Sequence, residues 1–164
     1  MKWGIYLLGG FTVILLAIQF VPNELPTVVP TNPADILSSG IVSEDVAAII
    51  KTSCYNCHSN ETVYPWYSYV APSSWLVAKD VREGRKELNF SNWQDYDMME
   101  KLEKLDDIAI EVGEGTMPLG IYTLIHEYAS LDDEQRERIV EWAENAMDMV
   151  LEEEEEYEDN VDEE

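Results

Sequence analysis

The chain has little positive charge for its length. Its 164 residues include 10 Lys and Arg against 34 Asp and Glu, which gives a formal net charge of -24. Because binding to nucleic-acid phosphates needs clustered Lys and Arg, this composition argues against a nucleic-acid partner. It favours protein partners with basic faces, since complementary fields speed encounter, although acidity also serves solubility.

The chain also lacks sustained alternation of apolar and polar residues, so nothing in it is typical of a β-strand. Apolar residues recur instead at helical spacing, which predicts an all-α domain. Candidate N-caps and capping boxes predict helix starts at Ser43, at Ser73 or Ser74, at Ser91 with Gln94, and at Ser130 with Asp133. The second of these helices is expected to end near Gly84, the third near Gly113, and a short helix is expected over residues 122–128.

Charge is absent from residues 3–21, "WGIYLLGGFTVILLAIQFV". As a helix this stretch would be about 28 Å long, close to the roughly 30 Å of a bilayer's hydrocarbon core. It is longer than a usual signal-peptide core, and no clear A-x-A cleavage site follows it. We therefore favour a retained anchor over a cleaved signal, with residues 1–21 as that segment.

Three further segments follow the anchor. Residues 22–42 are rich in proline, which predicts an extended tether. Residues 43–150 hold the helical pattern and form the expected folded domain. Residues 151–164 are a block of like charge and are expected to be disordered.

Cysteine and histidine are scarce, and three of the four residues stand together as Cys54-Tyr55-Asn56-Cys57-His58. A disulfide within this motif would close a tiny loop and add little stability. A thioredoxin-like dithiol needs a βαβ setting, which the sequence does not show. A zinc site would need four ligands, and only His126 could join these three, at a spacing that matches no common zinc pattern.

The remaining interpretation is that C-x-x-C-H is a c-type haem attachment site. The two thiols of Cys54 and Cys57 would form thioethers with the haem, and His58 would be the proximal iron ligand. An exported chain fits covalent haem attachment. The sequence therefore predicts haem c, one per chain.

A second axial ligand would come from a Met or a His, because both are usual in such proteins. Met117 lies in a glycine-rich loop and is followed by Pro118, whereas most other Met residues lie in expected helices, where Met normally fills the core. We favour Met117 over His126. An open sixth position would point to ligand sensing or peroxidase-like chemistry.

Two stretches carry a resemblance to a known family. They are "CYNCHSNETVYPWYSYVAPSSWLVAKDVREGRKELNFSNW" (54–93) and "GTMPLGIYTLIHEYASLDDEQRERIVEW" (115–142). In both, the chain resembles bacterial haem-binding-domain proteins of the cytochrome c type. The resemblance implies a small, mostly helical, cytochrome c-like haem domain exported from the cytoplasm. It also implies that Cys54, Cys57 and His58 form the haem site and that Met117 belongs to a recurring Met-Pro.

Three further residues are candidates for contact with haem. Trp66 and Tyr67 could wall a haem crevice, although aromatic residues more often serve as core. Arg85 could pair with a haem propionate, since guanidinium suits carboxylates.

These features together predict a membrane-tethered c-type cytochrome domain that carries single electrons and does no bond chemistry on a substrate. We expect it on the periplasmic side of a bacterial cytoplasmic membrane, where it would meet redox partner proteins. The alternatives are a peroxidase-like haem enzyme and a haem-based redox or gas sensor with a labile sixth ligand; a zinc-stabilised interaction module is a weaker one.

Overall fold

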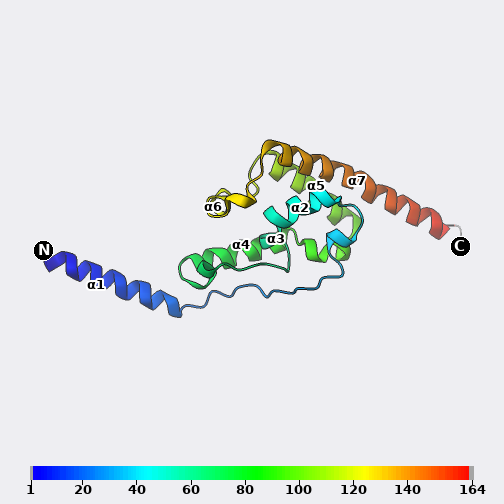
Figure 1. The fold of residues 1–164 in the computed structure, drawn as a ribbon. Helices are drawn as coiled ribbons and strands as arrows, with labels where there is room; N and C mark the ends of the chain where they lie inside the picture. Colours follow the sequence, from blue (N-terminus) through cyan, green and yellow to red (C-terminus); the bar gives the residue numbers. More distant parts are fainter. Residues whose placement is uncertain (1, 163–164) are drawn as a thin grey trace.

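The computed structural model describes the backbone of residues 2–162 and the side chains of residues 3–154. Within this part of the chain all regular structure is helical, as the sequence predicts (Figure 1). The longer helices are α1 (Lys2–Ala17), α2 (Glu44–Ser53), α4 (Ser73–Glu87), α5 (Met98–Gly113) and α7 (Asp133–Asp162). The short elements are η1 (Ile18–Phe20), η2 (Ile36–Ser38), α3 (Tyr55–His58), η3 (Trp66–Tyr69), η4 (Phe90–Asp95), α6 (Gly120–Thr123) and η5 (Glu127–Ala129).

Helix α1 stands away from the rest of the molecule (Figure 1). Its continuation through η1 makes Trp3–Phe20 the one helical stretch among the described residues that is long and apolar enough to cross a membrane. None of this stretch is buried against the protein. It is not a core helix, and its length and composition fit an anchor or a signal sequence.

The core forms where α5 and α7 pack side by side in opposite directions, with α2 against them. Ridges of apolar side chains at helical spacing meet there, because each helix must bury its apolar face. Leu105 of α5 and Ile139 of α7 are 0% and 1% exposed. The indole of Trp142 donates to the carbonyl of Ile41 at 2.9 Å, which joins α7 to the segment before α2.

The folded part begins earlier than residue 43. Ile36 of η2 is fully buried in the same core, and Asp35 is 6% exposed. The Tyr55 hydroxyl donates to Asp35 Oδ1 at 2.6 Å, and the Leu37 N–H donates to the same oxygen at 3.0 Å. Asp35 therefore caps η2 and ties it to α3.

The rest of the proline-rich segment is extended, as expected, but it lies on the domain instead of hanging free. The Val29 N–H donates to the Asn60 carbonyl at 2.7 Å. Arg82 and Arg85 of α4 donate to the carbonyls of Glu24 and Thr27 at 3.0 and 2.8 Å. Proline-rich backbone has carbonyls without partners of its own, and these arginines supply donors. The structure thus differs from a free tether over residues 22–42.

The charged end of the chain also differs from the expectation. The backbone of α7 continues as helix to Asp162, although residues 151–164 were predicted to be disordered; residues 163–164 lie outside the described part. The tail follows a helix that is already formed by packing through Val150, and Glu is a good helix former.

Helix boundaries shift from the predicted ones by a few residues. The capping box of α5 is Asp97 with Glu100, and a reciprocal pair at the start of α7 is Asp132 with Gln135. Ser91 lies instead inside η4, where its hydroxyl donates to Asp35. Helix α4 runs past Gly84 to Glu87.

Candidate functional site

The cysteine motif forms a single helical turn at the end of α2. Cys54 closes α2 and opens α3, and its carbonyl accepts the N–H groups of Cys57 and His58 at 3.1 and 3.0 Å. Both cysteines are free thiols and half-buried. Burial raises the pKa of Cys54 to about 12 and that of Cys57 to about 11. A redox dithiol needs a lowered pKa, so these thiols do not fit one.

The imidazole of His58 is oriented by the end of α4. Its Nδ1 lies 3.1 Å from the carbonyl of Leu88, so Nδ1 carries the proton and donates it. This leaves the lone pair of Nε2 available, which is the usual arrangement of a metal-binding histidine. Burial lowers the pKa of His58, which favours the neutral, ligating form.

Gly84 lets α4 pass directly against this motif. A Cβ at position 84 would lie 2.9 Å from the carbonyl oxygen of Cys57 and 3.2 Å from its carbonyl carbon. Such a contact is closer than atoms tolerate, so only glycine fits here. The α3–α4 packing therefore depends on Gly84.

Two adjoining cavities of about 300 and 270 Å³ open beside the motif. Cys54, His58 and Met117 line both of them, and we call the pair the central cleft. Its inner wall is apolar, with Phe90 and Trp142 among the side chains that form it. A mostly apolar space with a few convergent polar groups is typical of a cofactor site.

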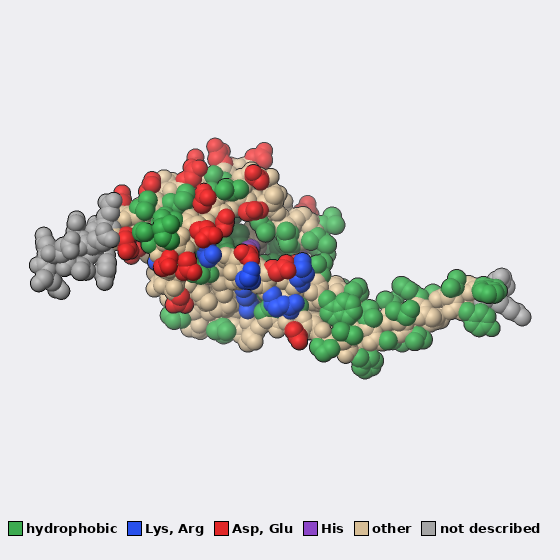
Figure 2. All heavy atoms as spheres, turned by 180° about the vertical axis from the view of Figure 1, so that it is seen from behind, with side chains coloured by type: hydrophobic (Ala, Val, Ile, Leu, Met, Phe, Trp, Pro, Cys, Tyr) green, Lys and Arg blue, Asp and Glu red, His purple; other side chains and the backbone are tan. Residues whose placement is uncertain are grey.

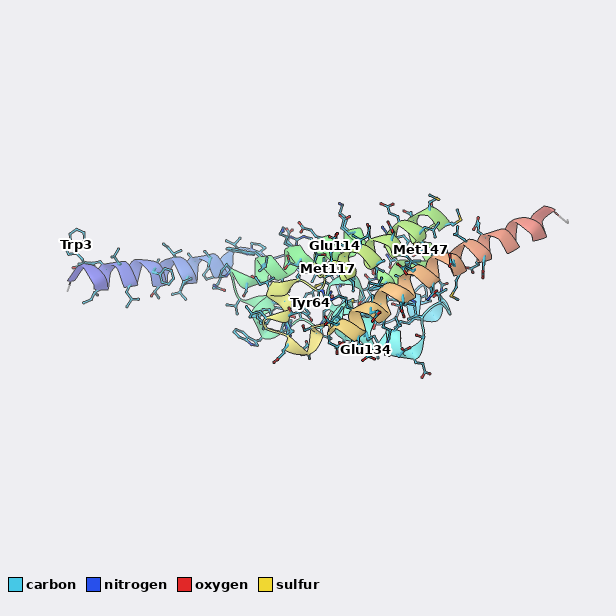
Figure 3. All side chains as sticks on the ribbon, turned by 90° about the horizontal axis from the view of Figure 1, so that it is seen from above. Trp3, Tyr64, Glu114, Met117, Glu134 and Met147 are labelled. Carbon is cyan, nitrogen blue, oxygen red and sulfur yellow. The ribbon has the colours of Figure 1, made fainter. Side chains whose placement is uncertain are left out.

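Met117 is held in the cleft by the loop after α5. Figure 3 shows it near the middle of the molecule, on the loop that leads to α6. Its N–H donates to the carbonyl of Glu111 at 3.1 Å, and Arg136 of α7 donates to its carbonyl at 3.3 Å. Gly115 allows the turn, because its φ of +78° is one that other residues rarely adopt.

The comparisons with known proteins agree with this geometry. Residues 13–145 match the family model described as a haem-binding domain. The chain belongs to this haem-binding domain family. Comparison with curated proteins and with solved structures gives no match. The match supports a haem cofactor and covers every residue of the central cleft.

The residues of this haem-binding domain fit a haem in the central cleft. Two free thiols, a neutral imidazole with a free Nε2 and a thioether line one largely apolar space. A zinc site fits less well, because the described residues include no group of three or more His, Cys, Asp and Glu placed to hold a metal ion. Cys54, Cys57 and His58 are the residues that would hold the haem.

His126, the rival axial ligand, lies outside the central cleft. Its Nε2 is hydrogen-bonded to the Tyr67 hydroxyl, and its ring packs on Tyr122 with centroids 4.5 Å apart. A small separate cavity of about 50 Å³ is lined by Cys57, Tyr67 and His126. The structure therefore brings Met117, and not His126, into the space that His58 faces.

The three other candidate residues also lie away from the central cleft. The Trp66 side chain is 77% exposed and lines neither cavity, because η3 turns it outward. The hydroxyl of Tyr67 is hydrogen-bonded to His126 Nε2, which lies outside the central cleft. Arg85 donates through Nη1 to the Thr27 carbonyl of the proline-rich segment and, at 2.9 Å, through Nη2 to the Thr62 hydroxyl, while its buried Nε has no hydrogen-bond partner among the described residues. These placements differ from the expected crevice wall and propionate partner.

The rim of the cleft is acidic. Asp80, Glu83 and Glu87 border one cavity, and Asp107 and Glu111 border the other beside Lys104. Burial and neighbouring carboxylates raise the pKa of Asp107, and burial raises that of Asp80. Lys104 also lines the cleft, and its Nζ lies 5.1 Å from the centre of the Tyr96 ring.

Sequence reasoning missed three residues that shape the site. Leu88 matters only through its backbone carbonyl, which carries no sequence signal. The sequence pattern predicts a helix end at Gly84, but a glycine inside a helical pattern is also a signal of close packing, which is its role here. Asp35 stands just before an apolar pair, which is typical of a cap, but its bond to Tyr55 spans 20 residues.

Proposed function

We propose that this haem-binding domain is a c-type cytochrome that carries single electrons, with one covalently attached haem per chain. The observation that carries the proposal is that Cys54, His58 and Met117 line the same two adjoining cavities. A haem held there supplies one-electron chemistry, because its iron is stable in two oxidation states. A cytochrome c-like arrangement of the helices belongs to the same proposal.

Each residue then has one role. Cys54 and Cys57 would attach the cofactor, and the bond from His58 Nδ1 to Leu88 leaves Nε2 as the imidazole nitrogen that would bind the iron. Met117 would offer its thioether as a second ligand to the iron, since Arg136 and the Glu111 carbonyl hold its backbone where it lines the cleft. The apolar wall keeps water from the cofactor, which stabilises a bound ligand and tunes the potential.

We also propose where the domain works and what it meets. Residues 3–20 anchor it in the bacterial cytoplasmic membrane, with the folded part in the periplasm, where c-type haem is attached. The acidic rim favours redox partner proteins with basic faces, because electrostatic steering raises association rates. Figure 2 shows acidic side chains spread over the folded part of the molecule.

One experiment tests the carrier function. The full chain, made with a c-type maturation system, is titrated electrochemically as wild type, as Met117→Leu and as the matched Met147→Leu. Met147 lies on α7 (Figure 3) and lines neither cavity of the central cleft. We expect a reversible one-electron wave and a far-red Met–iron band that only Met117→Leu abolishes. Ready binding of carbon monoxide to the reduced wild type would contradict the carrier and support a sensor or a peroxidase.

A further inference from the structure

Two exposed loops near the membrane helix carry almost no charge. Residues 62–78 and 115–126 contain no Asp, Glu, Lys or Arg, in a chain of which 27% is charged. The first includes η3 and the start of α4, and the second includes α6. Such stretches are expected inside a soluble protein, so their exposure needs an explanation.

The exposed side chains in these loops are large and apolar. Trp66, Tyr69 and Val70 are 77%, 64% and 41% exposed. Ile121, Leu124 and Ile125 are 54%, 83% and 62% exposed. We call these six residues the apolar end. They line neither cavity of the central cleft, so haem binding does not account for them.

The two loops form one surface because side chains connect them. The Tyr67 hydroxyl is hydrogen-bonded to His126 Nε2, which joins η3 to the segment between α6 and η5. Asn56 of α3 donates to the Tyr122 hydroxyl at 2.8 Å, which fixes α6 to the haem motif. The apolar end therefore keeps a fixed position relative to the cleft.

The end of the membrane helix is bonded to this same surface. The side chain of Gln19 donates to the Ala71 carbonyl at 3.0 Å and accepts from the Ala71 N–H at 2.9 Å. Asn23 donates to the Ser68 carbonyl at 2.9 Å. These three hydrogen bonds hold the end of the membrane helix directly against η3 and the residues that follow it.

The length of the span sets the depth of this junction. A helix of 18 residues from Trp3 to Phe20 is about 27 Å long, nearly the thickness of the hydrocarbon core. Gln19 and Phe20 then lie at the membrane surface. In Figure 1 both α6 and the start of α4 lie at the end of the domain from which α1 leaves, and Figure 2 shows hydrophobic side chains gathered at that end.

We propose that the apolar end rests in the headgroup region of the same membrane that α1 crosses, so that the haem domain is fixed to the lipid surface instead of swinging on a tether. The inference rests on the membrane anchoring given under the proposed function. Trp and Tyr suit the membrane interface, where one part of the ring is apolar and the other wet. Uncharged loops tolerate that depth, whereas the acidic body does not.

Photolabelling of the full haem-loaded chain tests this proposal. The chain is reconstituted in vesicles of phosphatidylcholine and phosphatidylglycerol that include a phosphatidylcholine with a diazirine high on its acyl chain. Mass spectrometry then locates the labelled peptides. We expect residues 63–70 and 121–126 to be labelled at roughly the level of α1 and about tenfold above α5. Label on α1 without label on the two loops would overturn the proposal and leave the anchor standing; no label on α1 would overturn both.

A pair of matched variants tests the insertion itself. Leu124→Glu places a carboxylate in the apolar end, whereas Met99→Glu does so at an exposed position on α5, where the side chain is 65% exposed. We expect Leu124→Glu to lower the labelling of residues 121–126 about fivefold, because a charge is costly near the acyl chains. Met99→Glu should leave it unchanged. Equal labelling of residues 121–126 in Leu124→Glu and Met99→Glu would overturn the proposal.

Discussion

Replacing Gly84 with alanine tests whether α4 and the cysteine motif pack as described. The new Cβ would lie 2.9 Å from the Cys57 carbonyl oxygen and 3.3 Å from the Cys57 Cβ, so backbone would have to move. Overpacking of this kind costs about 1–3 kcal/mol. Alanine also favours a helix over glycine by up to about 1 kcal/mol, which would hide part of that cost.

Gly113→Ala provides the matched control, because it lies in α5 and its Cβ would meet only Val140 Cγ2 at an ordinary 3.7 Å. The gain in helix propensity applies to both variants. We therefore expect the free energy of unfolding of Gly84→Ala to be about 1–3 kcal/mol below that of Gly113→Ala, measured by urea denaturation of the haem-free full chain in detergent. Equal stabilities, within about 0.5 kcal/mol, would refute the close approach of α4 to Cys57.

Three other outcomes follow from the same contacts. Tyr55→Phe removes the hydroxyl that donates to the buried Asp35 and should lower the free energy of unfolding by about 1–3 kcal/mol. The control Tyr128→Phe, at a residue that is 63% exposed, should change it little. A Tyr55→Phe variant as stable as the wild type would contradict the link between η2 and α3. In the reduced, haem-free chain, iodoacetamide should alkylate Cys54 and Cys57 slowly at pH 8, and the rate should keep rising beyond pH 10, because their pKa values are raised to about 12 and about 11; a plateau near pH 9 would refute the burial. The free energy of unfolding of the haem-free chain should not depend on these thiols below pH 9 and should fall above it. The reason is that the thiols of the unfolded chain, with a pKa of 9.0, lose their protons before those of the folded chain. A free energy of unfolding that stays constant up to pH 11 in urea melts would contradict this expectation.

The sequence predicted the helical class, the cysteine motif and the place of Met117 because these depend on local patterns. An apolar stripe at helical spacing locates α2, α5 and α7, and C-x-x-C-H is compact enough to be recognised without a fold. Met117 stood apart because it was the methionine of a glycine-rich loop. The structure places Met117 and His58 in the lining of the same central cleft, and the role of Met117 as an iron ligand stays a prediction.

Residues that act across long sequence distances were harder to assign. Arg85 was expected at a haem propionate, but its partner Thr27 is 58 residues away, in a segment whose composition suggested a free tether. Trp66 was expected in a crevice because it follows the motif closely, yet η3 turns its ring outward. The capping box expected at Ser91 with Gln94 does not form, and the Gln94 N–H donates instead to the Ala34 carbonyl, 60 positions earlier in the chain.

Covalent attachment of haem to Cys54 and Cys57 can be measured on the denatured protein. The full chain is made with a c-type maturation system, denatured, and examined by intact mass and by the pyridine haemochrome spectrum, beside a Cys54→Ala/Cys57→Ala variant. We expect one haem on the denatured wild-type chain, bound through two thioethers, and none on the variant. A wild-type chain that loses its haem on denaturation, or that never acquires one, would contradict it.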